Sequence, residues 1–512
     1  MRINEEKQRR GENVEVRKEF HRRLAGASRY FRIFRILLFV LLSGAVVAQN
    51  TKPQSQKPEK KDNKPKLDQI SSHVIIISVS GLRANDINKT DSRQIRIPTI
   101  QTLRAQGAYA VNVESVYPSL TGPAHATIVT GTLPADHGIA SDFPFDEQSG
   151  TQSQELHFQS KEIKTETIWD LAKRGGFITS AVGFPLTAGA TIDFNLPVNF
   201  DENSSSEAEA TRTQSFSQSH VQPPELQNQF TQQLKTDLFV ENKKLKEIAK
   251  DQKLDFSKAV AAAYLIEKHR PNLLMVNFSS FARAEQRYGL SSPESVAALE
   301  FVDDLIKKIV DSVKRGELMN ETTLIVVSDY GVMRVDQVFN PNCVLAKKGL
   351  LMVDGQGRIT SWQAVAQTFG GSAAIFIQNP QDEKTSREIE KVFNEYFEKP
   401  DSPLWRIISR RESSQLGADP HAAFYLDAAP LYAMSPRANG SIISKVPERA
   451  AHGYLPSRSE MRTTLIISGK GIKQGTKIEY ARLIDIAPTV ARLFGLEMRT
   501  ARGRVLSEVI AQ

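Results

Sequence analysis

Residues 74–83 of this chain read VIIISVSGLR, a run of β-branched residues that ends in a polar turn. Such a run is typical of a strand buried on both faces of a parallel sheet. Two similar runs follow much later, LLMVNF at residues 273–278 and TLIVV at residues 323–327. Amphipathic stretches typical of helices lie between them, at residues 257–269 and 293–315. The alternation predicts an α/β domain, a three-layer α/β/α sandwich with a central, mostly parallel sheet.

The first 48 residues carry most of the excess positive charge. The net charge of the whole chain is +8, and residues 1–48 hold a surplus of 6 basic over acidic residues. The remainder is nearly neutral, which argues against a nucleic-acid partner. Basic residues precede an apolar run at residues 36–42 and a small-residue cleavage motif before Gln49, so residues 1–48 are predicted to be an export signal. An uncleaved membrane anchor through residues 36–48 remains the alternative.

Export implies a periplasmic, extracellular or membrane-anchored domain, which is expected over residues 70–512. Residues 49–69 are polar and rich in Lys and Pro, which predicts a flexible linker. Inside the domain, residues 202–232 are rich in Ser, Gln and Glu and are interpreted as a polar surface insertion. Residues 340–445 are predicted to include a smaller subdomain. Cys343 is the only cysteine, so no internal disulfide is expected.

Polar residues follow each predicted strand, where open parallel sheets place their functional groups. The first strand leads into Ser80-Gly81-Leu82-Arg83, the second into residues 279–289, and the third into Ser328-Asp329-Tyr330-Gly331. A further segment, YPSLTGPAH at residues 117–125, opens an apolar helix that ends near Gly131. Thr121 is expected at or near the start of that helix, where unpaired N–H groups can hold a phosphoryl group or activate a hydroxyl. A simple capping role for Thr121 is the alternative.

These segments together resemble the type I phosphodiesterase/nucleotide pyrophosphatase family of the alkaline phosphatase superfamily. The resemblance is carried by VYPSLTGPAHATIVTGTLPADHGI, SPES…LEFVDDLI, TTLIVVSDYG, AHGYLP…MRTTLIISGKGIKQG and RLIDIAPTVARLFGLEMRTARGRVL. It covers about residues 73–508 and implies an alkaline-phosphatase-like fold. It also implies hydrolysis of phosphodiesters by a threonine nucleophile with two zinc ions, a pair that stabilises attacking and leaving oxygens.

The resemblance assigns a role to each position, and the nucleophile is retained as Thr121. Two metal-ligand positions are also retained, Asp329 and His452. Four expected carboxylate or imidazole ligands are replaced, and these positions are Ser80, Ala282, Gln286 and Tyr330. Ser80 and Tyr330 belong with Asp329 to the zinc that activates Thr121, whereas Ala282 and Gln286 belong with His452 to the other zinc.

Two further positions bear on this pattern. Asp142 replaces the asparagine that steadies a phosphate oxygen, and a carboxylate there would repel a dianion unless it were protonated or metal-bound. Glu285 is a less favoured stand-in for a lost ligand because it lies one residue away from the family position.

The lost ligands favour a pseudoenzyme, because zinc sites need three or more carboxylate, imidazole or thiolate ligands. The expectation is therefore no cofactor, or a weakly bound one, and a binding or regulatory role in the cell envelope. Its partner would be an unknown envelope component or a phosphodiester-like ligand. One alternative is an active hydrolase that uses Thr121 with one metal or none. A second is a structural envelope protein whose partner surface lies elsewhere, for instance on residues 202–232.

Overall fold

The structure, a computed structural model, describes residues 67–88, 95–146, 148–153, 159–197, 220–230, 232–233, 250–379 and 382–511. The predicted leader at residues 1–48, most of the linker and most of the 202–232 insertion lie outside the described residues. The described end of that insertion packs inward, because Val221 and Leu226 are buried in the core. Among the described helices, none has the length and apolar character needed to cross a membrane.

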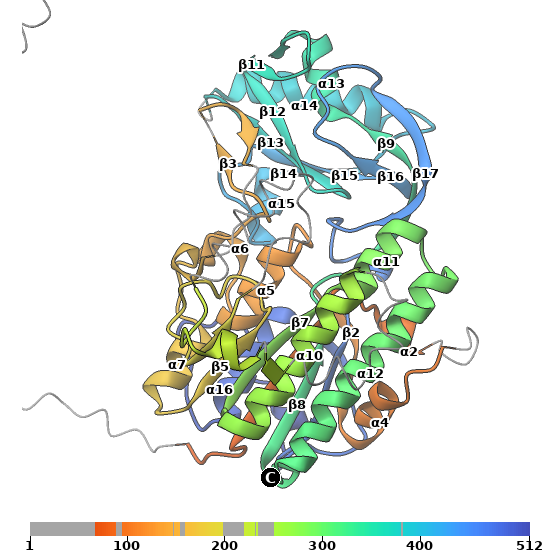
Figure 1. The fold of residues 1–512 in the computed structure, drawn as a ribbon. Coiled ribbons are helices and arrows are strands. Elements are labelled where there is room, and N and C mark those ends of the chain that lie inside the picture. The colour runs from red at the N-terminus through yellow and green to blue at the C-terminus, as the bar shows by residue number, and fades with distance from the viewer. Residues whose placement is uncertain are drawn as a thin grey trace, which may run out of the picture. The chain divides into compact units, whose positions relative to one another are not determined.

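An eight-stranded sheet forms the centre of the domain (Figure 1). Its strands, in spatial order, are β19 (Thr476–Arg482), β2 (Ala108–Glu114), β18 (Leu465–Gly469), β8 (Thr322–Val327), β1 (His73–Val79), β7 (Leu273–Phe278), β5 (Thr179–Val182) and β6 (Phe194–Leu196). β18 pairs antiparallel with both of its neighbours, and the other pairings are parallel. The sequence prediction of a mostly parallel central sheet is therefore confirmed, with its three predicted strands adjacent at the centre.

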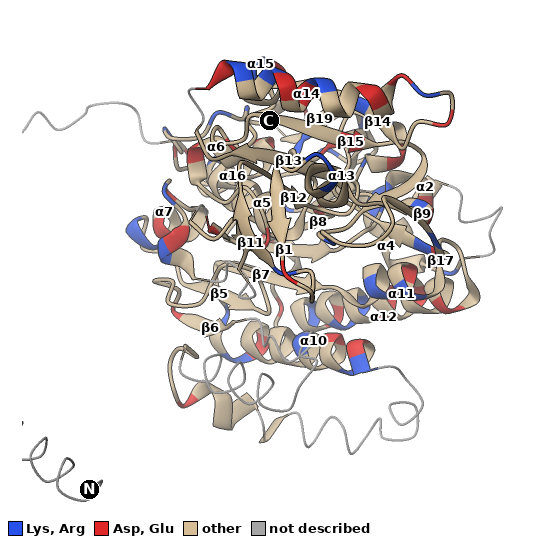
Figure 2. Cartoon of the chain, turned by 90° about the horizontal axis from the view of Figure 1, so that it is seen from above, with Lys and Arg blue, Asp and Glu red and all other residues tan. Residues whose placement is uncertain are grey.

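Alternate side chains of β1 enter two separate cores, as expected for a strand covered on both faces. Val74 and Ile76 pack with residues of α5 (Thr121–Thr130), α7 (Ile168–Arg174) and α16 (Ile486–Leu493). Ile75 and Ile77 pack with residues of the opposite layer, formed by α4 (Pro98–Gln106), α10 (Lys250–His269) and α12 (Pro293–Arg315). The charged residues lie mainly on helices such as α10 and α12 and leave the central strands uncharged (Figure 2).

A second body of strands and helices has its own core (Figure 1). Four antiparallel strands form one sheet, in the order β12 (Ala364–Thr368), β13 (Ser372–Ile377), β15 (Phe424–Ala428) and β14 (Leu404–Ser409). A three-stranded sheet contains β16 (Leu431–Met434), β9 (Met333–Phe339) and β17 (Ile443–Ala451). β9 leaves the central domain soon after β8, and β17 returns the chain to it. Most elements of this second body lie within residues 340–445, whereas β9 and most of β17 lie outside that range.

Candidate functional site

The carboxyl ends of three adjacent strands place the predicted site residues close together. β1 pairs in parallel with β8 and with β7, with Ser78 opposite both Val327 and Asn277. The turn after β1 therefore carries Ser80 beside Asp329, which follows β8. The loop after β7 leads directly into α11 (Ser280–Tyr288), which carries Ala282 and Gln286.

Asp329 is completely buried, and its carboxylate is bound by protein donors. Its Oδ2 accepts a hydrogen bond from the Ser80 hydroxyl at 3.0 Å, and its Oδ1 accepts from the backbone N–H of Gly81 at 3.3 Å and of Tyr330 at 2.9 Å. Burial raises the pKa of this carboxyl to about 6, and the three hydrogen bonds oppose that shift. Ser80, where the resemblance implies a metal ligand, is thus a hydrogen-bond donor to Asp329.

A neutral histidine, His125, lies close to the Asp329 carboxylate, with its Nδ1 3.7 Å from Oδ2. His125 is buried on α5, and its Nδ1 lies 2.8 Å from the Thr121 carbonyl oxygen, which can only accept, so Nδ1 carries the proton. Its Nε2 therefore accepts from the Asn277 amide at 2.8 Å and from the Ser78 hydroxyl at 2.9 Å. Burial lowers the pKa of His125 to about 4, so the imidazole is uncharged beside Asp329. The sequence prediction did not identify this role for His125.

Thr121 is the first residue of α5, with Leu120 as the N-cap in extended conformation. The Tyr330 phenol lies near the Thr121 side chain. Burial and the nearby Asp329 hold the pKa of Tyr330 well above its ordinary value, so the phenol keeps its proton at neutral pH. The Tyr330 ring also stacks on His452, with centroids 4.2 Å apart. Tyr330 therefore lies between Thr121 and His452.

A small apolar cluster lies among the expected metal-ligand positions. It consists of buried Ala282, Tyr330, Val332 and Ala450. Gly81 packs directly against Ala282, because a Cβ on Gly81 would lie 3.0 Å from the Ala282 Cβ. The left-handed backbone at Gly81, φ +79°, also favours glycine at this turn. The turn after β1 and the first turns of α11 are thus held together by apolar contact.

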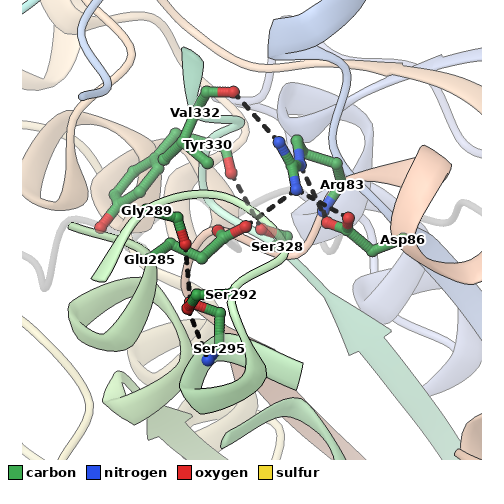
Figure 3. A network of polar contacts seen from close by, with 9 residues as sticks. All are labelled: Arg83, Asp86, Glu285, Gly289, Ser292, Ser295, Ser328, Tyr330 and Val332. Carbon is green, nitrogen blue, oxygen red and sulfur yellow. Dashed lines mark hydrogen bonds and ion pairs between the residues drawn. The ribbon is translucent and has the colours of Figure 1, made fainter. Parts of the chain in front are cut away.

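A buried ion network lies beside this cluster (Figure 3). The Arg83 guanidinium is 2.7 Å from Asp86 and 2.8 Å from Glu285, and it also donates to the Val332 carbonyl at 3.4 Å. Arg83, Asp86 and Glu285 all have little solvent exposure. The sequence alone gives Arg83 no role, and it suggests Glu285 only as a replacement metal ligand. In the structure Glu285 instead balances the charge of a guanidinium.

Asp142 interacts with the beginning of α5. Its Oδ1 accepts a hydrogen bond of 2.6 Å from the backbone N–H of Gly122, the second residue of that helix. An anion at a helix N-terminus is favoured by the unpaired N–H groups and the helix dipole. The carboxylate of Asp142 therefore lies where a bound anion would be stabilised.

A cavity of about 430 Å³ opens between α5, α11 and the second body. The residues that line it are Leu120, Asp142, Phe143, Gln152, Gln286, Thr368, Phe369, Gly370, Arg449, Ala450, Ala451 and His452. Gln286 and His452, both expected at the second zinc, thus border the same cavity as Asp142. Burial lowers the pKa of His452 to about 4. Across the described ranges, no group of three or more His, Cys, Asp or Glu residues is placed to hold a metal ion.

Comparisons with known proteins agree with this fold. A solved structure of murine ectonucleotide pyrophosphatase/phosphodiesterase 5 superposes with a TM-score of 0.60 at 16% identity, covering 86% of this chain and all of that one. The same coverage and TM-score hold for its inactive variant in complex with AMP. At this identity the likeness shows a shared fold.

Sequence relatives match over shorter stretches. An uncharacterized pyrophosphatase/phosphodiesterase of Schizosaccharomyces pombe is 26% identical over 282 residues, which are 53% of this chain and 49% of that protein. Human ectonucleotide pyrophosphatase/phosphodiesterase family member 1 is 30% identical over 124 residues, 24% of this chain and 13% of that protein. The matched stretches thus span half or less of these relatives. The profile of the type I phosphodiesterase/nucleotide pyrophosphatase family matches residues 74–454, so the chain belongs to that family.

Proposed function

We propose that this chain is a non-catalytic member of its family that has lost the two-metal chemistry and has a binding or regulatory role. The main support is the surroundings of Asp329. Its carboxylate accepts three hydrogen bonds from Ser80, Gly81 and Tyr330, and the Tyr330 ring packs against His452. The retained ligands are thus engaged with the residues that replaced their former partners.

The donor set does not fit two zinc ions. Zinc takes thiolate, imidazole and carboxylate ligands, and a catalytic site keeps three of them per ion. Ser80, Ala282, Gln286 and Tyr330 offer a hydroxyl, a methyl, an amide and a phenol whose pKa is raised by burial. Glu285 is engaged with Arg83 at 2.8 Å, and a guanidinium there would oppose a second cation. We therefore assign no reaction step to a metal in this chain.

The proposed role lies outside the cytosol, with an envelope component or a small ligand as the partner. The basis for this location is the basic and apolar pattern of residues 1–48. A structural envelope role remains a separate proposal, and its main candidate surface, residues 202–232, lies largely outside the described residues.

A second candidate function is hydrolysis with Thr121 as the nucleophile. It is favoured by the position of Thr121 in the first turn of α5. His125 accepts hydrogen bonds at Nε2 and is bonded at Nδ1 to the Thr121 carbonyl, so it is not placed to take the hydroxyl proton of Thr121. Because His125 is excluded as the base, hydrolysis is the weaker candidate.

The test is to measure zinc and turnover on the same preparation. We expect the purified full chain to contain far less than one zinc ion per molecule, because its donors are too few. We also expect a chromogenic phosphodiester to be hydrolysed no faster by the wild type than by Thr121→Ala, with or without added zinc. Two zinc ions per chain, or turnover that disappears in Thr121→Ala, would refute the proposal.

A further inference from the structure

We propose that Asn439 is a site of spontaneous covalent modification, at which the side-chain amide is lost as ammonia and the backbone becomes an isoaspartyl linkage. The site lies in the connection between β16 and β17 of the second body (Figure 1). Asn439 precedes Gly440, and this is the single Asn-Gly step in the chain. The inference is independent of whether the chain hydrolyses phosphodiesters.

The reaction needs water and no other partner. The backbone nitrogen of Gly440 attacks Cγ of the Asn439 side chain and forms a C–N bond. The bond from Cγ to the side-chain nitrogen breaks, and that nitrogen leaves as ammonia with the proton from the Gly440 nitrogen. Water then opens the cyclic succinimide at either carbonyl. Opening at the main-chain carbonyl gives isoaspartate, and opening at the side-chain carbonyl gives aspartate.

The local structure leaves this attack open. Asn439 and Gly440 are both exposed to solvent. A Cβ built on Gly440 would meet no atom within 4 Å in the described part of the chain, and the residue has a φ of +89°. Glycine has no side chain to crowd its own nitrogen, and asparagine is among the thermolabile residues. Asn320 is also exposed, but Glu321 follows it and its side chain crowds the attacking nitrogen.

The connection is held on both sides of this step. On one side, Ala438 is buried in the core of the second body. On the other side, the carbonyls of Ser441 and Ile442 accept hydrogen bonds of 2.8 Å from the side chain and the backbone N–H of Asn340. The residues next to the Asn-Gly step are thus fixed, whereas the step itself faces solvent.

The product cannot keep these anchors unchanged. An isoaspartyl linkage passes through Cβ, so it lengthens the main chain between Ala438 and Ser441. The β17 ladder begins directly after the anchors, with Ile443 opposite Phe339 of β9. Because the connection before a strand helps to set its register, we expect the modification to loosen the start of β17.

The modification also removes a contact between two turns. A Cβ on Gly357 would lie 2.5 Å from Nδ2 of Asn439, so the amide packs directly on that glycine. Gly357 belongs to the turn between β10 (Leu351–Val353) and β11 (Ile359–Trp362). Loss of the amide therefore ends the contact between this turn and the connection that precedes β17.

The first measurement ages the purified full chain at mildly alkaline pH, where more of the attacking nitrogen is deprotonated. Peptide mapping by mass spectrometry follows each asparagine and distinguishes isoaspartate from aspartate by fragmentation. Asn320 is the matched control within the same sample. We expect Asn439 to be converted at least tenfold faster than Asn320, with isoaspartate as the main product.

Two variants test the mechanism. Gly440→Ala places a methyl group beside the attacking nitrogen, so we expect at least tenfold slower conversion of Asn439. Because alanine is strained at this φ, Asn439→Gln is made as well. Glutamine would have to form a larger ring, so position 439 is expected to stay unmodified in this variant.

The second measurement is hydrogen exchange on fresh and aged chain. We expect faster exchange at residues 443–445 in the aged wild type and no change in aged Asn439→Gln. The proposal is overturned if Asn320 is converted as fast as Asn439, if neither variant slows conversion at position 439, or if the aged wild type exchanges like the fresh chain. Zinc content and turnover, measured separately, decide the proposed function independently of this result.

Discussion

The fourfold variant Ser80→Asp, Ala282→Asp, Gln286→His and Tyr330→His is expected to make the folded chain depend on zinc. With Asp329 and His452 it has six carboxylate or imidazole groups at the ends of β1 and β8, on α11 and after β17. Without metal, the new carboxylates lie next to buried Asp329, where like charges and desolvation are strongly destabilising. With zinc, these groups become the ligands that the metal requires.

The expected size of this effect follows from linkage between binding and folding. Free zinc at about 100 times its dissociation constant adds about 2.7 kcal/mol to the stability of the folded state. For a chain of this size that corresponds to a rise of about 3 °C in Tm. We expect such a rise in the fourfold variant and none in the wild type, measured by thermal unfolding with zinc and with a chelator.

Two paired variants serve as controls, since each rebuilds one ligand set. Ser80→Asp with Tyr330→His joins Asp329, whereas Ala282→Asp with Gln286→His joins His452. Each pair is expected to bind one zinc ion by elemental analysis and the fourfold variant two. If the fourfold variant folds but binds no zinc, the assignment of the four positions as former ligands is wrong.

The central fold was readable from sequence because its strands are buried on both faces. The runs at residues 74–79, 273–278 and 323–327 correspond to β1, β7 and β8, and the amphipathic stretch at residues 293–315 matches α12. Continuous β-branched runs and helical periodicity are local signals. The helix preceding β7 begins at Lys250, earlier than predicted. The prediction missed its first turns because they are polar and lack a clear apolar stripe.

The contacts around the site were not readable, because they join residues that are distant in the chain. Arg83 and Glu285 are about 200 positions apart, and nothing in either local sequence indicates that they pair. The same applies to Asn277 with His125 and to the stacking of Tyr330 on His452. The resemblance to the family indicated which positions to compare, but side-chain packing determines what each residue there contacts. Here the replacements are an apolar cluster and a buried ion pair.

Replacing Asp329, the one carboxylate among the six proposed ligand positions, should increase stability at neutral pH. Burial raises the folded-state pKa of Asp329 from 3.8 to about 6, so the folded state binds a proton more tightly than the unfolded state. This contribution to stability is full below about pH 4, falls as the pH rises to 6, and is gone above it. At pH 7 this pKa shift lowers the free energy of unfolding by about 3 kcal/mol.

Asp329→Asn removes this cost, because asparagine has the same shape and does not ionise. Its oxygen can still accept from the N–H groups of Gly81 and Tyr330, while its amide donates to the Ser80 hydroxyl, which must turn. The turned hydroxyl costs about 1 kcal/mol. We expect a net gain of about 2 kcal/mol at pH 7 and little or none at pH 4, measured by urea unfolding at several pH values.

Asp427→Asn is the matched control, since Asp427 is equally buried and burial also raises its pKa to about 6. Asp427 differs in having the buried Arg458 guanidinium as its partner. Its loss leaves that cation without a counter-charge, so we expect this variant to lose about 3–5 kcal/mol. The two variants should differ because Asp427 pairs with a cation, whereas the donors around Asp329 are a hydroxyl and two backbone amides, all uncharged. If Asp329→Asn instead weakened the fold at pH 7 by a similar amount, Asp329 would need a cationic partner in the native protein, and a metal ion would be the first candidate.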